Sequence, residues 1–301
     1  MRIGILGIGA IGGFLASVLD SSDHEIICIC RHETCAKIQK SGLNLKSESF
    51  LSRNFSPKIT YQLDKDIDIL LIATKYQYLN DAINLISLKH THNTLVIPLL
   101  NGIGFHDSLT AHFGNQVGLG TIGSIEVEKN DCTILHKSSS MVPKIELAVD
   151  KDALKNKLFE LADIFRDSGL EVEVLNSQSQ VVWGKLLRLN AIASFTAAYQ
   201  KTIGEIRQDP DNWKEMNDFI KESLLVAAKD GYYGDLKKII KSIEGLPSNL
   251  MTSLQKDVMA RKESELDAIT GGVIKKGIKN NIDLPIHHLI YNKIKSRLNR
   301  T

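Results

Sequence analysis

The sequence predicts an α/β protein in which a parallel sheet with helices on both sides is followed by an all-α domain. Apolar strand-like runs alternate with helix-like runs over the first half of the chain, which is the pattern of βαβ units. After Leu175 the apolar residues instead repeat with the period of an α-helix. Because a chain of 301 residues corresponds to about two domains, we place the domains at residues 1–175 and 176–301.

The strands predicted in the first half are short and almost wholly apolar. The run Ile67–Ala73 contains a single polar residue, as expected of a strand that is buried on both faces. Helix-like stretches separate such runs, so successive strands can lie parallel. Strands are predicted at Ile3–Leu6, Ile26–Cys30, Ile67–Ala73, Leu95–Leu100, Val117–Val127, Thr133–His136, Lys144–Val149 and Glu171–Leu175, and helices at Phe14–Leu19, Cys35–Lys40, Leu79–Ile86 and Lys151–Asp167.

The second half is predicted to be a series of helices. Few β-branched runs occur there, and Pro210, Pro247 and Pro285 mark boundaries because proline is excluded from the interior of a helix. The predicted helices are Ser179–Ala198, Asn212–Asp230, Leu236–Ser242, Ser253–Lys279 and His287–Leu298.

Composition and charge exclude several classes of protein. A net charge of +2 gives no reason to expect nucleic acid or a membrane as a partner. Apart from the N-terminal run, no apolar run approaches the roughly 18 residues that span a bilayer. In the N-terminal apolar run, four of the seven positions from Gly7 to Gly13 are glycine, which makes the run a poor secretion signal. The four cysteines are expected to be reduced thiols rather than disulfides or metal ligands, which favours a cytoplasmic location.

A glycine-rich turn follows the first predicted strand and precedes the first predicted helix, as in the dinucleotide-binding fingerprint. Gly7 permits the tight turn, Gly9 lets the backbone approach a pyrophosphate, and Gly12 lets the helix pack closely on the strand. The helix N-terminus also favours phosphate charge. We therefore predict a Rossmann-type dinucleotide-binding domain whose cofactor-binding turn comprises Gly7, Ile8, Gly9, Ala10, Ile11 and Gly12.

The residue at the end of the second strand predicts which dinucleotide binds. NAD enzymes usually place an acidic residue there to bind the ribose hydroxyls, whereas this chain has Arg31. An arginine attracts a 2′-phosphate through charge-assisted hydrogen bonds, so we predict NADP(H) rather than NAD(H). Lys75 and Asn101 follow two later strands, at the edge of the sheet where ligands of open α/β sheets bind.

A lysine on an apolar helix face is a candidate for catalysis. Val181, Lys185 and Leu189 share one face of the predicted helix Ser179–Ala198. A lysine desolvated there would have a lowered pKa and could act as a general acid, although it could instead extend along the helix to reach water. A second set of residues has the same spacing of four and, by spacing alone, would form a solvent-facing charge ladder on one helix: Ser253, Asp257, Arg261 and Glu265.

Taken together, these residues resemble the ketopantoate reductase (2-dehydropantoate 2-reductase) family over nearly the whole chain. The turn Gly7–Gly12 with Arg31 is similar to the family's NADP site, and Trp183-Gly-Lys185 resembles the segment that holds its catalytic lysine. Ser253 and Glu265 resemble residues of its C-terminal segment. The resemblance implies that Lys185 and Glu265 are catalytic, that NADP(H) also contacts Arg31, Lys75 and Asn101, and that a 2-keto acid contacts Asn101, Lys185, Ser253 and Glu265, with no metal.

The reaction that the resemblance implies is the NADPH-dependent reduction of ketopantoate to pantoate in pantothenate biosynthesis, with Lys185 as proton donor. The chain departs from the family at three positions, because Leu189, Ala193 and Ile203 stand where asparagines are usual, and Asn190 is out of register. Two alternatives therefore stay open. One is another NADP-dependent 2- or 3-hydroxy acid oxidoreductase, and the other is a non-catalytic NADP(H)-binding sensor. A homodimer also stays open.

Overall fold

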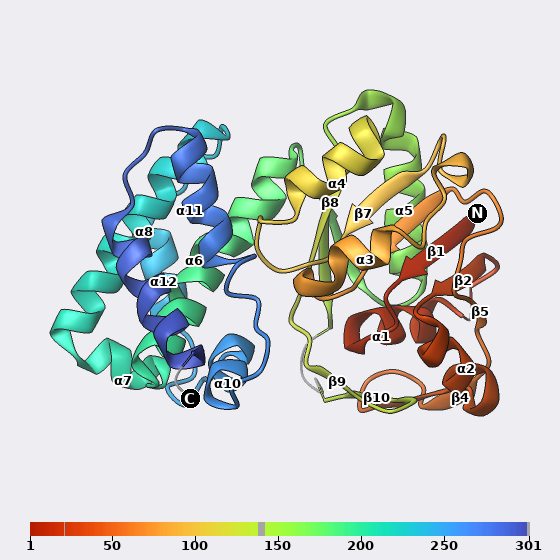
Figure 1. The fold of residues 1–301 in the computed structure, drawn as a ribbon, viewed down its shortest axis with the longest axis horizontal. Helices are drawn as coiled ribbons and strands as arrows, with labels where there is room; N and C mark the ends of the chain where they lie inside the picture. The colour runs from red at the N-terminus through yellow and green to blue at the C-terminus, as the bar shows by residue number, and fades with distance from the viewer. Residues whose placement is uncertain (21, 138–141, 300–301) are drawn as a thin grey trace. The chain divides into compact units, whose positions relative to one another are not determined.

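The chain forms two compact units in a computed structural model that describes residues 1–20, 22–137 and 142–299 (Figure 1). The first unit comprises Met1–Leu100 and Asp107–Val181, and the second comprises Asn101–His106 and Val182–Thr301. Arg300 and Thr301, which end the predicted helical domain, lie outside the described residues. The predicted fold class is confirmed, because a unit built around a parallel sheet is followed by a helical one.

The main sheet of the first unit has the order β5-β2-β1-β6-β7, and every pair of neighbouring strands in it is parallel. Its apolar strands are buried on both faces, which explains their continuous hydrophobic runs. Parallel pairing requires crossover connections, and helices supply most of them. The strands are β1 (Arg2–Leu6), β2 (Glu25–Ile29), β5 (Lys58–Thr60), β6 (Ile69–Ile72) and β7 (Leu95–Pro98).

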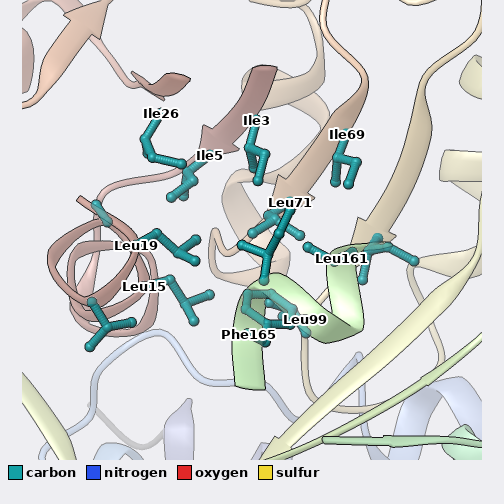
Figure 2. Packing of buried hydrophobic residues seen from close by; sticks show 14 of the residues in the cluster. Ile3, Ile5, Leu15, Leu19, Ile26, Ile69, Leu71, Leu99, Leu161 and Phe165 are labelled. Carbon is teal, nitrogen blue, oxygen red and sulfur yellow. The ribbon is translucent and has the colours of Figure 1, made fainter. Parts of the chain in front are cut away.

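Three helices of the first unit, at Ala10–Leu19, His32–Ser41 and Lys155–Asp167, bury apolar side chains in one core with strands of this sheet. Figure 2 shows side chains of α1 and α5 gathered beneath the strands, where they form one continuous core with alternate residues of β1 and β6. The labelled core residues include Ile3, Ile5, Leu15, Leu19, Ile69, Leu71, Leu161 and Phe165. The helices are α1 (Ala10–Leu19), α2 (His32–Ser41), α3 (Leu79–Ile83), α4 (His106–Phe113) and α5 (Lys155–Asp167).

Two smaller sheets complete the first unit, with orders β4-β3-β10-β9 and β12-β11-β8. The prediction of one strand over Val117–Val127 is wrong, because the chain turns at Ser124, whose φ is +54°, and enters a different sheet. Short strands such as β4 were not predicted because three residues show no clear alternation. The strands are β3 (Leu43–Ser47), β4 (Arg53–Phe55), β8 (Leu119–Gly123), β9 (Val127–Asn130), β10 (Thr133–His136), β11 (Lys144–Ala148) and β12 (Glu171–Val174).

The second unit is helical and has its own apolar core. Capping residues explain where two of its helices begin. Thr202 and Glu205 form a capping box at one, and Asp209 caps another whose first residue is Pro210. No helix in the described part of the chain is long and apolar enough to span a membrane. The helices are α6 (Gln178–Tyr199), α7 (Ile203–Gln208), α8 (Pro210–Lys229), α9 (Leu236–Glu244), α10 (Ser253–Met259), α11 (Thr270–Lys279) and α12 (Pro285–Leu298).

The predicted helix Ser253–Lys279 is wrong, because it is two helices separated by ten residues. The first, α10, ends at Met259, and Arg261 then adopts a φ of +52°, which an α-helix cannot accommodate. The Lys262 N–H donates to the Asp257 carbonyl at 2.9 Å, which satisfies one of the orphan carbonyls at that helix end. The charge ladder predicted along one face therefore does not exist, and Glu265 lies in the connection instead.

Candidate active site

The glycine-rich turn has the geometry that its sequence predicts. Gly7 has a φ of +94°, and a Cβ there would lie 2.9 Å from the Thr74 nitrogen. A Cβ on Gly12 would lie 2.0 Å from the Gly7 carbonyl oxygen, so only glycine lets α1 start this close to β1. At Gly9, by contrast, a Cβ would meet nothing nearer than 4.0 Å. The turn is therefore tight on its inner side and open at Gly9, as a backbone cradle for a phosphate must be.

The first turn of α1 offers N–H groups to such a ligand. Gly9 is the N-cap residue of this helix and makes no side-chain cap, so the N-cap residue itself does not occupy those donors. The first N–H groups of any α-helix lack partners within the helix. Together with the helix dipole they attract an anion, which fits the pyrophosphate of a dinucleotide.

Arg31 and Lys75 are both exposed in this unit. Arg31 comes two residues after the end of β2 and is the N-cap of α2, and its guanidinium lies 5.4 Å from the ring centroid of Tyr78. Among the described residues Arg31 forms no ion pair, so its charge is available to an anion. Lys75 follows Thr74, the residue that packs against Gly7. Tyr78 was missed by sequence analysis, and its only signal was its place three residues after Lys75.

In the second unit, three of the predicted site residues form a chain of hydrogen bonds. The Lys185 Nζ of α6 donates to the Asn101 Oδ1 at 3.0 Å, and the Asn101 Nδ2 donates to the Glu265 Oε2 at 3.0 Å. The partners fix the amide orientation, because an ammonium can only donate and a carboxylate can only accept. All three side chains are part-buried, and Asn101 therefore holds a cation and an anion at fixed separation.

Backbone contacts hold Asn101 and Glu265 in register. The N–H groups of Ile103 and Gly104 both donate to the Ala268 carbonyl, at 2.9 and 3.1 Å. Gly102 has a φ of +90°, and a Cβ on it would lie 2.1 Å from the same carbonyl oxygen. The segment that follows Asn101 is thus docked on the turn that follows Glu265, which fixes the two side chains relative to each other.

Ser253 is not part of this hydrogen-bonded group. It is the exposed first residue of α10, and within the described residues no hydrogen bond joins it to Lys185, Asn101 or Glu265. Of the residues that replace the expected asparagines, Ala193 and Ile203 are at most 1% exposed and belong to the apolar core. Leu189, one turn after Lys185, is only half-buried. It is therefore the one of the three that still presents apolar surface on the lysine's face of α6.

Asn190 takes no part in the Lys185–Asn101–Glu265 group, because it is wholly buried and bonded to other residues. Its Nδ2 donates to the His287 Nε2 at 3.2 Å, and its Oδ1 accepts from Thr270 and Ser194 at 3.0 and 3.1 Å. The His287 Nδ1 lies 2.7 Å from the Glu222 carboxylate. Burial lowers the pKa of His287, and the contacts fit a ring whose Nδ1–H donates to Glu222 and whose Nε2 accepts from Asn190. Asn190 cannot replace the missing asparagines without breaking this network.

Burial also shifts the pKa values of two cysteine thiols that come shortly before Arg31 in the sequence. It raises the pKa of the Cys28 thiol to about 12, and that of Cys30 is raised by burial and by its contact with Cys35. All four cysteines are free. In the part of the chain that the structure describes, no three His, Cys, Asp or Glu side chains are grouped so as to hold a metal ion.

Comparison with known proteins covers almost the full chain. The family described as "Ketopantoate reductase PanE/ApbA" matches residues 3–143, and its C-terminal counterpart matches residues 177–298. A 2-dehydropantoate 2-reductase of Archaeoglobus fulgidus is 22% identical over 296 residues, which are 98% of this chain and 97% of that protein.

Two solved structures have the same fold. A probable 2-dehydropantoate 2-reductase of Bacillus subtilis matches with a TM-score of 0.84 and 23% identity over 99% of this chain and all of that chain (100%). A D-mandelate dehydrogenase, solved with NADH and anilino(oxo)acetate, matches with a TM-score of 0.86 and 20% identity over 99% of both chains.

Proposed function

The chain belongs to the ketopantoate reductase family, a family of oxidoreductases, and on that premise we propose that it reduces a 2-keto acid to the 2-hydroxy acid with NADPH. The observation that carries the proposal is the hydrogen-bonded chain Lys185–Asn101–Glu265. A cation held in place by a neutral amide, with a carboxylate behind it, is suited to protonating an alkoxide.

A nicotinamide dinucleotide is the cofactor that the first unit fits. The open glycine turn and the uncapped start of α1 would hold the pyrophosphate, and the exposed Arg31 would hold a 2′-phosphate, which favours NADP(H) over NAD(H). Bound there, the cofactor supplies a hydride to the ketone carbon. The D-mandelate dehydrogenase of similar fold was solved with NADH, so a nicotinamide dinucleotide is compatible with this architecture.

Lys185 would donate the proton in this reaction. As the ketone carbon accepts hydride, the carbonyl oxygen becomes an alkoxide, and the Lys185 Nζ would transfer a proton to that oxygen. Asn101 keeps the ammonium oriented, since its Oδ1 accepts an N–H from the Lys185 Nζ. Glu265 fixes the other end of the amide and would contact the substrate as a hydrogen-bond acceptor.

The substrate is proposed to be ketopantoate, the substrate that the family name states. A specific observation favours a second candidate, a 2-keto acid with an apolar side chain: half-buried Leu189 lies one turn from Lys185 where an asparagine would bind a hydroxyl. We expect the chain to reduce ketopantoate but to discriminate only weakly against ketoisovalerate-like acids without the hydroxyl. A hydroxyl-binding site would instead discriminate by a factor of about 10⁴ or more.

The test is the rate of NADPH oxidation with ketopantoate and a panel of 2-keto acids. We expect turnover, and we expect Lys185→Ala to lower kcat by about 10²–10⁴-fold while NADPH still binds. Lys275→Ala, an exposed lysine on α11, is the matched control and should change neither quantity. Turnover by Lys185→Ala at the wild-type rate would refute the assignment. NADPH binding with no turnover of any 2-keto acid would favour the sensor.

A further inference from the structure

A lysine outside the fingerprint holds the glycine-rich turn. The Lys129 Nζ, from strand β9, donates to the Ile8 carbonyl at 2.5 Å. Ile8 is the residue between Gly7 and Gly9, so this contact lies within the turn that would bind the pyrophosphate. Lys129 comes more than a hundred residues later in the chain, and nothing in the fingerprint predicts it.

The fold places Lys129 there through close packing of a sheet against α1. Along β9 exposure alternates, so Val127 and Lys129 face inward while Glu128 faces solvent. Lys129 pairs with Ile134 on β10, and a Cβ on Gly13 of α1 would lie 2.4 Å from the Ile134 Cδ1. Glycine at that position therefore lets the sheet approach the first turns of α1 closely enough for Lys129 to reach Ile8.

This hydrogen bond orients a peptide group of the turn. The Ile8 carbonyl and the Gly9 N–H belong to one planar trans peptide and point in opposite directions. When Lys129 holds the carbonyl, the Gly9 N–H is directed to the other side of the peptide plane. Lys129 also offsets the partial negative charge of a carbonyl that would otherwise repel an anion bound at the turn.

The charge of Lys129 is not neutralised by an ion pair. No carboxylate lies within ion-pair distance of its ammonium among residues 1–20, 22–137 and 142–299, since the neighbouring Asp131 contacts Lys37 at 3.9 Å instead. Burial lowers the pKa of Lys129, because the charged form loses hydration. A bound anion would compensate for that lost hydration.

We propose that Lys129 is a further residue of the dinucleotide site, which orients the Ile8–Gly9 peptide and adds positive charge at the pyrophosphate position. The proposal rests on the proposed function, since it requires that the turn bind a dinucleotide. It differs from the role of Arg31, because the pyrophosphate is common to both cofactors. Lys129 therefore contributes equally to NADPH and NADH binding, whereas Arg31 discriminates between them.

The experiment compares Lys129→Gln, Lys129→Arg and the control Lys137→Gln by calorimetric titration with NADPH and NADH. Gln keeps an N–H donor but loses the charge, and Arg keeps both. Lys137 lies one residue beyond β10 of the same sheet and pairs with exposed Glu128, so the control removes the same charge at a position without contact to the turn.

Lys129→Gln is expected to raise the Kd of both cofactors by about tenfold and to make binding less sensitive to salt, while Lys129→Arg stays near wild type. A merely structural lysine would lower the thermal midpoint without changing the salt dependence. Wild-type affinity in Lys129→Gln, or an equal loss in Lys137→Gln, would overturn the inference. If the wild-type protein bound neither cofactor, the proposed function itself would fail.

Discussion

Replacing Asn101 by alanine tests the hydrogen-bonded chain at its centre. The substitution removes both the bond from Lys185 and the bond to Glu265, each 3.0 Å long and each to a charged group. Hydrogen bonds to charged groups contribute about 1.5–3 kcal/mol each. Because the three side chains are only part-buried, solvent would replace part of this interaction. We therefore expect a loss of about 2–3 kcal/mol of transition-state stabilisation.

Such a loss corresponds to a decrease in kcat of roughly 30- to 150-fold. The effect should fall on kcat more than on KM, because the bond matters most when Lys185 transfers its proton. Steady-state kinetics with the best 2-keto acid measure both constants, and a titration with NADPH checks that the cofactor still binds. Asn217→Ala is the matched control, since the Asn217 side chain donates to the Trp213 carbonyl within α8.

Asn101→Asp keeps nearly the same side-chain volume, so it tests whether the orienting hydrogen bonds of the amide matter. It keeps an acceptor for Lys185 but removes the donor to Glu265 and places a second carboxylate beside it. We expect its kcat to be lowered as well, because two adjacent carboxylates repel each other and compete for the ammonium. If Asn101→Ala kept kcat within about threefold of wild type, the activation free energies of the variant and the wild type would differ by less than about 1 kcal/mol. The bridging role assigned to Asn101 would then be wrong.

Two further substitutions test the cofactor preference and the buried network. Arg31→Ala should weaken NADPH by roughly 10- to 100-fold and leave NADH nearly unchanged; equal loss for both cofactors in a binding titration would show that Arg31 does not contact the 2′-phosphate. Burial lowers the pKa of His287 in the folded state, so below its unfolded pKa only the unfolded chain takes up the proton. Stability should therefore fall by up to about 1.4 kcal/mol per pH unit on acidification through about pH 6.5, and denaturant unfolding of His287→Gln should show a flatter dependence in that range.

The sequence predicted those parts of the first unit whose structure depends on residues close together in the chain. Strands such as β6 are continuous apolar runs, and the glycine turn has backbone requirements that the residues themselves meet. The failures have a common cause in distant contacts. The break between α10 and α11 coincides with a turn whose Ala268 carbonyl accepts N–H groups from Ile103 and Gly104. Those partners lie more than 160 residues away in the sequence, so helical periodicity could not reveal the break.

The same distant contacts explain why the candidate site could be predicted only as a set of residues. Each of Lys185, Asn101 and Glu265 was singled out by position or by resemblance, but the amide that links them spans 164 residues between Asn101 and Glu265. Spacing along a supposed single helix instead placed Glu265 in a ladder with Ser253, and the structure shows no such helix. The role of Asn190 also needed the structure, because only the positions of His287 and Thr270 show that its amide is occupied.

The residue that orients Lys185 is different from the residue that lies beside it on α6. Lys185 is held by Asn101, and the segment that follows Asn101 is held by backbone hydrogen bonds from Ile103 and Gly104 to the Ala268 carbonyl. Leu189 lies one turn further along α6 and packs against the apolar core. A change of side chain at Leu189 can therefore alter what lies next to the lysine without removing any hydrogen bond that orients it.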